Sequence, residues 1–302
     1  MATTTKSTTV SAPGKILLAG GYLVLESPNV GVVLAVDKKF YSTVVQRPKT
    51  TTTTTKEDEE PDTKKPKVAN DTTSMEIKVH SPQFDATWYY LANTTRGTSG
   101  STTTKIMANE LNPSSNSFVE KTLRVSMAYL YASTATPFGS DDNINLDITI
   151  LADNDFYSVT PHLQARKWDA TPEKLAQLPK FLPCITADNG SLQKTGLGSS
   201  AALVTSLVGA LVLSATNATQ MDDALRRRIH NLAQICHCHA QGKVGSGFDV
   251  SSASFGSHVY QRFPKCLLSD LLQDFDKTTS DNVMSDKTAT LLQHLVEESP
   301  EN

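Results

Sequence analysis

The sequence predicts a fold of the α+β or α/β class, in which strands and helices interleave along one chain. Strand-like alternation or valine enrichment occurs at residues 30–45, 75–80 and 144–151. Helical periodicity occurs at residues 120–131, 201–215 and 222–240. Elements interleaved in this way bury their apolar faces as a sheet with helices packed against it.

The first half of the chain contains strands separated by polar stretches. Residues 30–45 predict a strand pair, because they are rich in valine and bounded by turn residues. Residues 49–74, with six consecutive threonines and a charged run, offer few apolar side chains to bury, so we expect a low-complexity flexible insert. Residues 93–117 predict a second insert of the same kind.

The second half is mainly helical. Residues 201–215 are apolar almost all round, which predicts a buried helix. Residues 222–240 are amphipathic and begin with two acids, which favour the positive end of a helix dipole. Two shorter amphipathic helices are predicted at residues 267–275 and 287–298.

The bulk composition favours a soluble intracellular protein. The 302 residues carry a net charge of -3, so no global field recruits nucleic acid or a membrane surface. The N-terminus is polar and no run of 18 apolar residues occurs, so we expect no membrane insertion. Four cysteines without a disulfide pattern suit a reducing compartment, the cytoplasm or the peroxisome. The composition does not determine the oligomeric state.

Residues 194–202 are the most informative segment, because a loop with two glycines leads directly into the apolar helix. In order, the residues are Lys194, Thr195, Gly196, Leu197, Gly198, Ser199, Ser200, Ala201 and Ala202. Glycines allow a close approach of the backbone to an anion, and a helix N-terminus offers free N–H groups and a partial positive charge. The segment therefore predicts a phosphate-binding loop for a nucleotide.

Two other phosphate-binding motifs match residues 194–202 less well. A Walker loop requires a lysine after its last glycine, and none follows Gly198. The dinucleotide fingerprint is met by Gly196, Gly198 and Ala201, but the apolar strand that should precede it is missing. By themselves, Ser199 and Ser200 would more commonly be simple helix caps.

Two further glycine segments contain candidate charged residues. In residues 11–26, Lys15 follows a Pro-Gly turn and an apolar run ends at paired glycines. In residues 241–253, three glycines precede a helix start at which Asp249 stands. Composition alone makes Lys15 a solvated turn lysine and Asp249 a helix cap.

Together, these three segments closely resemble the GHMP kinase family, and in particular its phosphomevalonate kinase branch of the fungal type. Supporting stretches lie at residues 81–84, 118–124 and 152–158, and the resemblance extends over residues 10–263. It implies an α+β fold, similar to the second domain of ribosomal protein S5, for an N-terminal ATP-binding domain at residues 1–265. Residues 266–302 would begin a linker or C-terminal domain.

The resemblance also implies that the family's ferredoxin-like C-terminal domain is largely absent. That domain carries a third glycine-rich motif, and no glycine follows Gly256 in this chain. We therefore expect a truncated kinase, whose last helices expose apolar surface.

The resemblance assigns roles to individual residues. Lys15 neutralises the transferring phosphoryl group and Asp249 faces the acceptor, which makes these two the catalytic pair. Residues 194–202 bind ATP, with Ser200 as a ligand of Mg²⁺. Tyr22 and Ser246, together with the catalytic pair, are the candidate contacts to the acceptor.

The implied reaction is ATP-dependent phosphorylation of 5-phosphomevalonate to 5-diphosphomevalonate, in the mevalonate route to isoprenoids and sterols. A phosphate acceptor is already an anion, so Asp249 would orient it or pair with Lys15 instead of removing a proton. Two alternatives remain open: another GHMP kinase such as mevalonate kinase, in which Asp249 acts as a base, or a nucleotide-binding remnant without catalysis.

A histidine- and cysteine-rich stretch at residues 236–239 does not predict a metal site. Successive side chains on a helix point in different directions, so these four cannot converge on one ion.

Overall fold

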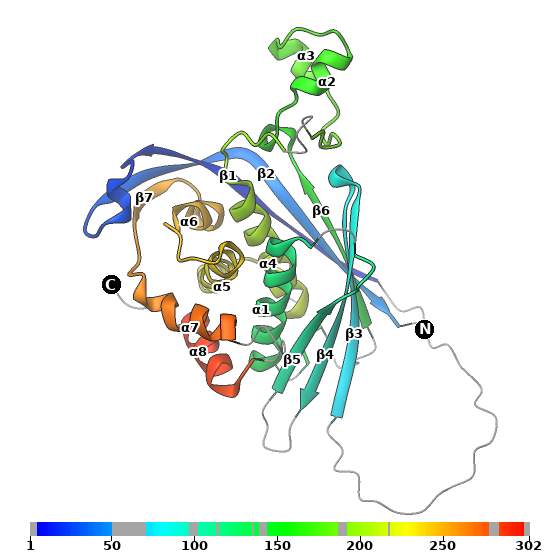
Figure 1. Cartoon of the computed structure of the whole chain (residues 1–302), viewed down its shortest axis with the longest axis vertical. Helices are drawn as coiled ribbons and strands as arrows, with labels where there is room; N and C mark the ends of the chain where they lie inside the picture. Colours follow the sequence, from blue (N-terminus) through cyan, green and yellow to red (C-terminus); the bar gives the residue numbers. More distant parts are fainter. Residues whose placement is uncertain are drawn as a thin grey trace, which may run out of the picture.

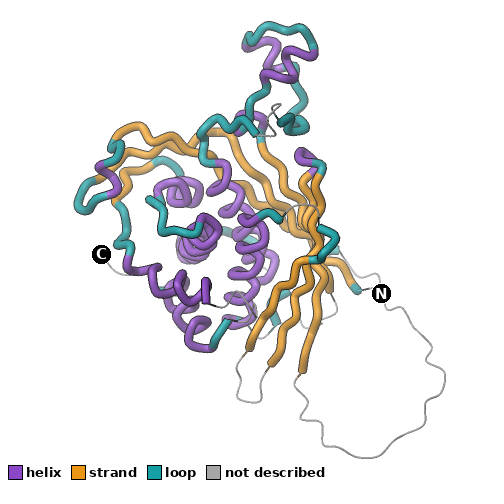
Figure 2. Tube along the Cα trace, viewed as in Figure 1, coloured by secondary structure: helices purple, strands orange, loops and turns teal. Residues whose placement is uncertain are grey.

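The computed structural model describes residues 5–49, 71–96, 102–112, 115–134, 136–138, 144–186, 192–216, 218–277 and 284–298. In these residues a mixed sheet has helices packed on one face, with a small helical excursion projecting from one end (Figure 1, Figure 2). This confirms the α+β prediction. The strand order is β1-β2-β6-β3-β4-β5, and β7 pairs with β2.

The strands are β1 (Lys6–Ala19), β2 (Val30–Pro48), β3 (Asp71–Ser81), β4 (Ala86–Arg96), β5 (Thr102–Ala108), β6 (Ile144–Ala152) and β7 (His258–Gln261). All the pairings are antiparallel except that between β3 and β6. Three short 3₁₀ helices, η1 (Leu23–Leu25), η2 (Pro82–Phe84) and η3 (Asn154–Phe156), follow β1, β3 and β6.

The predicted strand pair at residues 30–45 is wrong, because β2 is one continuous strand. Its charged residues at 37–39 interrupt the apolar pattern, and the register with β1 shifts there: Lys39 lies opposite Pro13, whereas Ala35 lies opposite Lys15. One end of β2 pairs with β7 and the other with β6. This length places the end of β1 and the start of β7 on the same part of the sheet.

The predicted flexible insert at residues 93–117 is also wrong for much of its length. Residues 93–96 continue β4, residues 102–108 form β5, and residue 117 begins a helix. Threonine is β-branched and suits a strand, and the buried hydroxyls of Thr94 and Thr104 lie 3.2 Å apart across the hairpin. In the other insert, residues 71–74 belong to β3, while residues 50–70 lie outside the described residues.

In the described residues, α1 (Ser117–Ser133), α4 (Ser199–Thr216) and α6 (Phe248–Phe255) pack on the inner face of the sheet, and α5 (Asp223–Gln241) packs against these three helices. The central helix α4 is apolar and long enough to span a membrane, but 72% of it is buried inside the protein, as expected of a core helix. A Cβ at Gly209 would lie 2.9 Å from Val10, so the glycine allows α4 to pack closely on β1.

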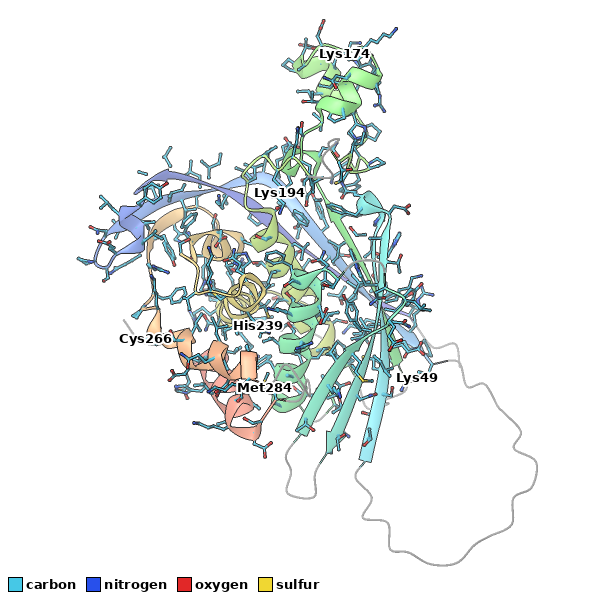
Figure 3. All side chains as sticks on the ribbon, in the orientation of Figure 1. Lys49, Lys174, Lys194, His239, Cys266 and Met284 are labelled. Carbon is cyan, nitrogen blue, oxygen red and sulfur yellow. The ribbon has the colours of Figure 1, made fainter. Side chains whose placement is uncertain are left out.

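The last two helices, α7 (Cys266–Lys277) and α8 (Asp286–Glu297), contact α1 and α5. Leu271, Leu292 and Val296 are at most 1% exposed and belong to the same core as the sheet and α4. Figure 3 shows Met284 on this side of the helical layer. The described part of residues 266–302 thus packs on the first domain, and the expectation that these helices leave apolar surface uncovered is wrong.

A small excursion contains α2 (Thr160–Ala165) and α3 (Pro172–Ala176) and projects beyond the sheet, with Lys174 near its tip (Figure 1, Figure 3). The backbone N–H of Ser158 donates to the carbonyl of Gln193 (2.9 Å), which brings the two ends of the excursion together. The chain therefore returns from this excursion directly into the glycine loop at residue 194.

Candidate active site

The glycine loop lies between β1 and the segment that follows β6. The N–H of Lys15 donates to the carbonyl of Leu197 (2.8 Å). On the other side, the N–H of Thr195 donates to the carbonyl of Phe156 (3.2 Å), and the Thr195 hydroxyl donates to the backbone carbonyl of Asp155 (2.6 Å). Backbone bonds on both sides thus hold the loop in place before any ligand binds.

Glycine is required here by space and by backbone conformation. A Cβ at Gly14 would lie 2.8 Å from the carbonyl oxygen of Leu197, so only glycine allows β1 to approach the loop this closely. Gly196 and Gly198 have φ angles of +87° and +75°, which L side chains rarely adopt. A Cβ at Gly198 would also lie 3.1 Å from Cε of Lys15.

The loop leads into the first turn of α4, as the sequence predicts. Ser199 and Ser200 are the first two residues of this helix, and the N–H of Ala202 donates to the carbonyl of Gly198 (3.1 Å). The remaining N–H groups of the first turn and the helix dipole form an electrostatic site for an anion. Lys194 is exposed beside this turn (Figure 3).

Lys15 lies against the loop and not against Asp249. Its ammonium donates to the carbonyl of Gly196 (3.0 Å) and lies 5.6 Å from the centre of the Phe248 ring. No ion pair joins Lys15 to Asp249, although both residues are described. Of the two roles suggested for Asp249, the structure shows no pairing with Lys15, whose ammonium lies against the glycine loop before the first turn of α4.

Asp249 lies in the first turn of α6 but is not its cap. The N-cap residue is Gly247, whose φ is +84°, and a Cβ there would lie 2.7 Å from both Phe263 and the hydroxyl of Tyr260. One carboxylate oxygen of Asp249 accepts from the N–H of Val250 (3.0 Å). Simple capping therefore does not account for this carboxylate, which is partly exposed.

His237 connects the two helix starts and was missed by the sequence analysis. It lies on α5, its side chain is 2% exposed, and its Nε2 is 3.0 Å from Oγ of Ser200 and 3.9 Å from Oδ2 of Asp249. Burial lowers the pKa of His237, and the negative charge of Asp249 acts in the opposite direction. The sequence contained one indication of this role: His237 lies on a predicted amphipathic helix, twelve residues before Asp249.

Side chains of β7 and of the residue after it donate hydrogen bonds to the glycine segment at residues 241–253. The hydroxyl of Tyr260 donates to the carbonyl of Ser246 (2.6 Å). The guanidinium of Arg262 donates to the carbonyls of Gly245 (2.6 Å) and Val244 (3.3 Å), and also to that of Leu25 (2.9 Å) in η1. These bonds join the turn after β1 to the segment that presents Asp249.

Tyr22 stands at the start of η1 with 90% of its surface exposed. The turn that carries it is attached through a small apolar cluster in which Val24 packs with Tyr260 and Phe248. The structure therefore brings the segments of Tyr22, Ser246 and Asp249 to one end of the molecule.

A cavity of about 500 Å³ opens beside the first turn of α4. Its walls include Trp88 of β4, Phe118 at the start of α1, Tyr157 after η3, and Lys194 with Ser199 and Ser200. The lining combines aromatic side chains with serine hydroxyls and the ammonium of Lys194. Such a lining suits a molecule with a flat aromatic part and a polar chain.

The described residues contain no group of three or more His, Cys, Asp or Glu side chains that could hold a metal ion. Mg²⁺ does not need such a cage, because it commonly takes one or two protein oxygens together with water and substrate phosphates. The hydroxyl of Ser200 and the carboxylate of Asp249 both approach His237 Nε2, at 3.0 Å and 3.9 Å. These oxygen donors suit Mg²⁺ bound with a nucleotide.

The chain is similar in sequence to known kinases. Residues 171–257 match the family described as GHMP kinases N terminal domain. A phosphomevalonate kinase of Aspergillus fumigatus is 39% identical over 276 residues, which cover 86% of this chain and 52% of that protein. The chain belongs to the GHMP kinase family.

A peroxisomal phosphomevalonate kinase of Arabidopsis thaliana is 35% identical over 279 residues, which cover 86% of this chain and 51% of the relative. This GHMP kinase chain thus spans about half the length of the curated relatives it matches. A solved phosphomevalonate kinase of Streptococcus pneumoniae, in complex with phosphomevalonate and AMPPNP, is a distant likeness, with 16% identity and a TM-score of 0.45. The aligned region covers 94% of this chain and 55% of the Streptococcus pneumoniae chain.

Proposed function

We propose that this chain belongs to an enzyme that transfers the γ-phosphoryl group of ATP to 5-phosphomevalonate, forming 5-diphosphomevalonate. The observation that carries the proposal is the position of Lys15, whose ammonium is 3.0 Å from the carbonyl of Gly196 beside the first turn of α4. The curated relatives named above bear the name of this activity. Phosphoryl transfer depends mainly on positioning and charge neutralisation, which these groups supply.

ATP would lie along residues 194–202. The base would enter the cavity of about 500 Å³ between Trp88 and Phe118, and the phosphates would receive N–H groups from the start of α4. Ser200, with Asp249 nearby, would hold Mg²⁺, which neutralises charge on the phosphate oxygens when bound.

Lys15 would act as a compact positive charge next to the transferring group. Its ammonium is fixed by the bond to the loop and by the ring of Phe248, so little reorganisation is needed during transfer. Lysine binds phosphate as a point charge, without the paired geometry of arginine.

The acceptor would lie at the end of the molecule where Asp249, Ser246 and Tyr22 gather. A phosphate monoester is anionic near neutral pH and needs little help from a base, so Asp249 would orient it. A second candidate acceptor is mevalonate, a neutral alcohol. With this acceptor, Asp249 would have to remove the proton of the hydroxyl group as a base.

The test is ADP release by the purified chain with Mg-ATP and either 5-phosphomevalonate or mevalonate. We expect turnover with the phosphorylated acceptor, loss of turnover in Lys15→Met, and a rate that depends weakly on pH. Faster turnover of mevalonate, with a steep fall below the pKa of a carboxylate, would support the mevalonate kinase alternative. Nucleotide binding without turnover on either acceptor would support a binding chain without catalysis.

We further propose that the protein acts in the cytoplasm, with the peroxisome as the alternative suggested by the name of the Arabidopsis relative. Imaging of a fluorescent fusion against a peroxisomal marker distinguishes the two compartments.

A further inference from the structure

Within the candidate active site, His237 is a buried side chain that approaches groups on both the nucleotide and the acceptor side. Its Nε2 is 3.0 Å from Oγ of Ser200 on α4 and 3.9 Å from Oδ2 of Asp249 on α6. The ring also lies 5.8 Å from that of Phe118 at the cavity wall. A side chain enclosed by three helices in this way has little freedom to turn.

The two nearest neighbours of Nε2, the side chains of Ser200 and Gln241, can both donate a hydrogen bond to it. The side-chain amide nitrogen of Gln241 faces it at 3.4 Å, and an amide nitrogen is a donor only. The Ser200 hydroxyl, which can donate or accept, is closer.

The direction of this bond matters for the serine. If Ser200 donates its proton to Nε2, the lone pairs of Oγ face the start of the helix, where the phosphates and Mg²⁺ are proposed to bind. A hydroxyl that ligates a cation must direct its hydrogen away from that cation, so it needs an acceptor on the far side.

We infer that His237 is a positioning residue that accepts the proton of Ser200 and thereby directs the serine oxygen toward the magnesium–nucleotide complex. This inference rests on the proposed function, since it concerns the same ATP site. His237 contacts neither ATP nor the acceptor in this arrangement and acts through Ser200.

The experiment compares His237→Leu, which removes the acceptor, with His237→Gln, whose amide oxygen can accept at a similar position. Binding of ATP is measured by calorimetry with Mg²⁺ and again with EDTA. We expect the magnesium-dependent affinity to fall about tenfold in His237→Leu and to be largely restored in His237→Gln, because loss of such an orienting partner typically costs that much. Binding in EDTA should not change.

His239→Leu is the matched control, since His239 is a second buried histidine on α5, 4% exposed, whose ring packs on Phe275. It should lower the unfolding temperature without changing the dependence on Mg²⁺. The double variant Ser200→Ala/His237→Leu should bind no more weakly than Ser200→Ala alone, because both changes remove the same interaction.

Several results would overturn the inference. Wild-type affinity in His237→Leu, or equal losses in His237→Leu and His237→Gln, would exclude an acceptor role. Failure of the wild type to bind Mg-ATP would overturn the proposed function and the inference together. If the wild type binds Mg-ATP and Ser200→Ala binds it equally well, Ser200 has no metal role, and only the inference is overturned.

A measurement on the unmodified protein covers the case in which a variant does not fold. The ¹⁵N shifts of the His237 ring nitrogens report which one carries the proton. A neutral ring with its proton on Nδ1 is expected, and a proton on Nε2 would contradict the inference.

Discussion

The guanidinium of Arg262 donates to the carbonyl of Gly245 at 2.6 Å, in the loop that precedes Asp249. The same side chain is 8% exposed and also donates to the carbonyl of Leu25, in the turn that follows Tyr22. One arginine after β7 thus joins the two segments that carry the candidate acceptor contacts, although those segments are far apart in the chain.

We predict that Arg262→Met lowers the free energy of unfolding by about 2–3 kcal/mol, because it leaves buried carbonyls without their charged donor. Amide hydrogen exchange should quicken in residues 20–26 and in residues 244–249 together. Arg227→Met is the control, since that exposed side chain should change the unfolding free energy by less than about 0.5 kcal/mol. Unchanged exchange in both segments would contradict the joining role.

Replacing Lys15 tests charge neutralisation directly. In the proposed kinase reaction, Lys15→Met should lower kcat by roughly 10²–10³, the usual cost of removing one preorganised group that stabilises developing charge. The fold should be retained, because the side-chain hydrogen bond of Lys15 goes to an exposed loop carbonyl. Lys174→Met, at the tip of the excursion, should keep full activity, and an equal loss there would indicate a general effect.

Two glycine substitutions separate backbone strain from crowding. Gly196→Ala meets nothing within 4 Å, so it should cost only the strain of a positive φ, about 1–2 kcal/mol of unfolding free energy. Gly198→Ala should cost more, because its Cβ would also press on Lys15 at 3.1 Å. Urea unfolding of the two variants measures the difference, and equal losses would show that Lys15 moves aside freely.

His230 should make stability depend on pH. Burial lowers its pKa from 6.5 to about 4, so between these values the unfolded chain binds a proton that the folded protein does not. The stabilisation is complete above pH 6.5 and is lost as pH falls toward 4, with a total of about 3 kcal/mol.

His230→Gln should reduce the fall in unfolding free energy over that range, measured by denaturant titration at several pH values. A further fall should remain from His239, whose pKa burial also lowers to about 4. His294 on α8 is 59% exposed and serves as the control, so His294→Gln should keep the full pH dependence. An undiminished dependence in His230→Gln would contradict the contribution of His230.

The sequence predicted the elements whose signals are local. The helix at residues 201–215 appears as α4, and the one at 222–240 appears as α5, with Asp222 accepting from the N–H of Leu225 as its cap. Apolar periodicity and capping involve residues only a few positions apart, so a sequence reveals them without knowledge of the fold.

The prediction of a flexible insert was wrong where the composition gave no sign that two strands pair. Residues 102–108 are polar and rich in threonine, which favoured a flexible insert, yet β5 pairs with β4 and buries Ile106. Polar residues that alternate with buried ones form an edge strand when a neighbouring strand is available, and the existence of that neighbour is not a local property.

By itself, the sequence predicted the glycine loop at residues 194–202 and its position at a helix start, because the spacing of glycine, serine and apolar residues is a local signal. Tertiary structure alone decided that Lys15 contacts Gly196, 181 positions away, and that His237 contacts Ser200 from another helix. Such contacts depend on how the sheet and helices pack, and burial against distant partners leaves no periodic signal in the chain.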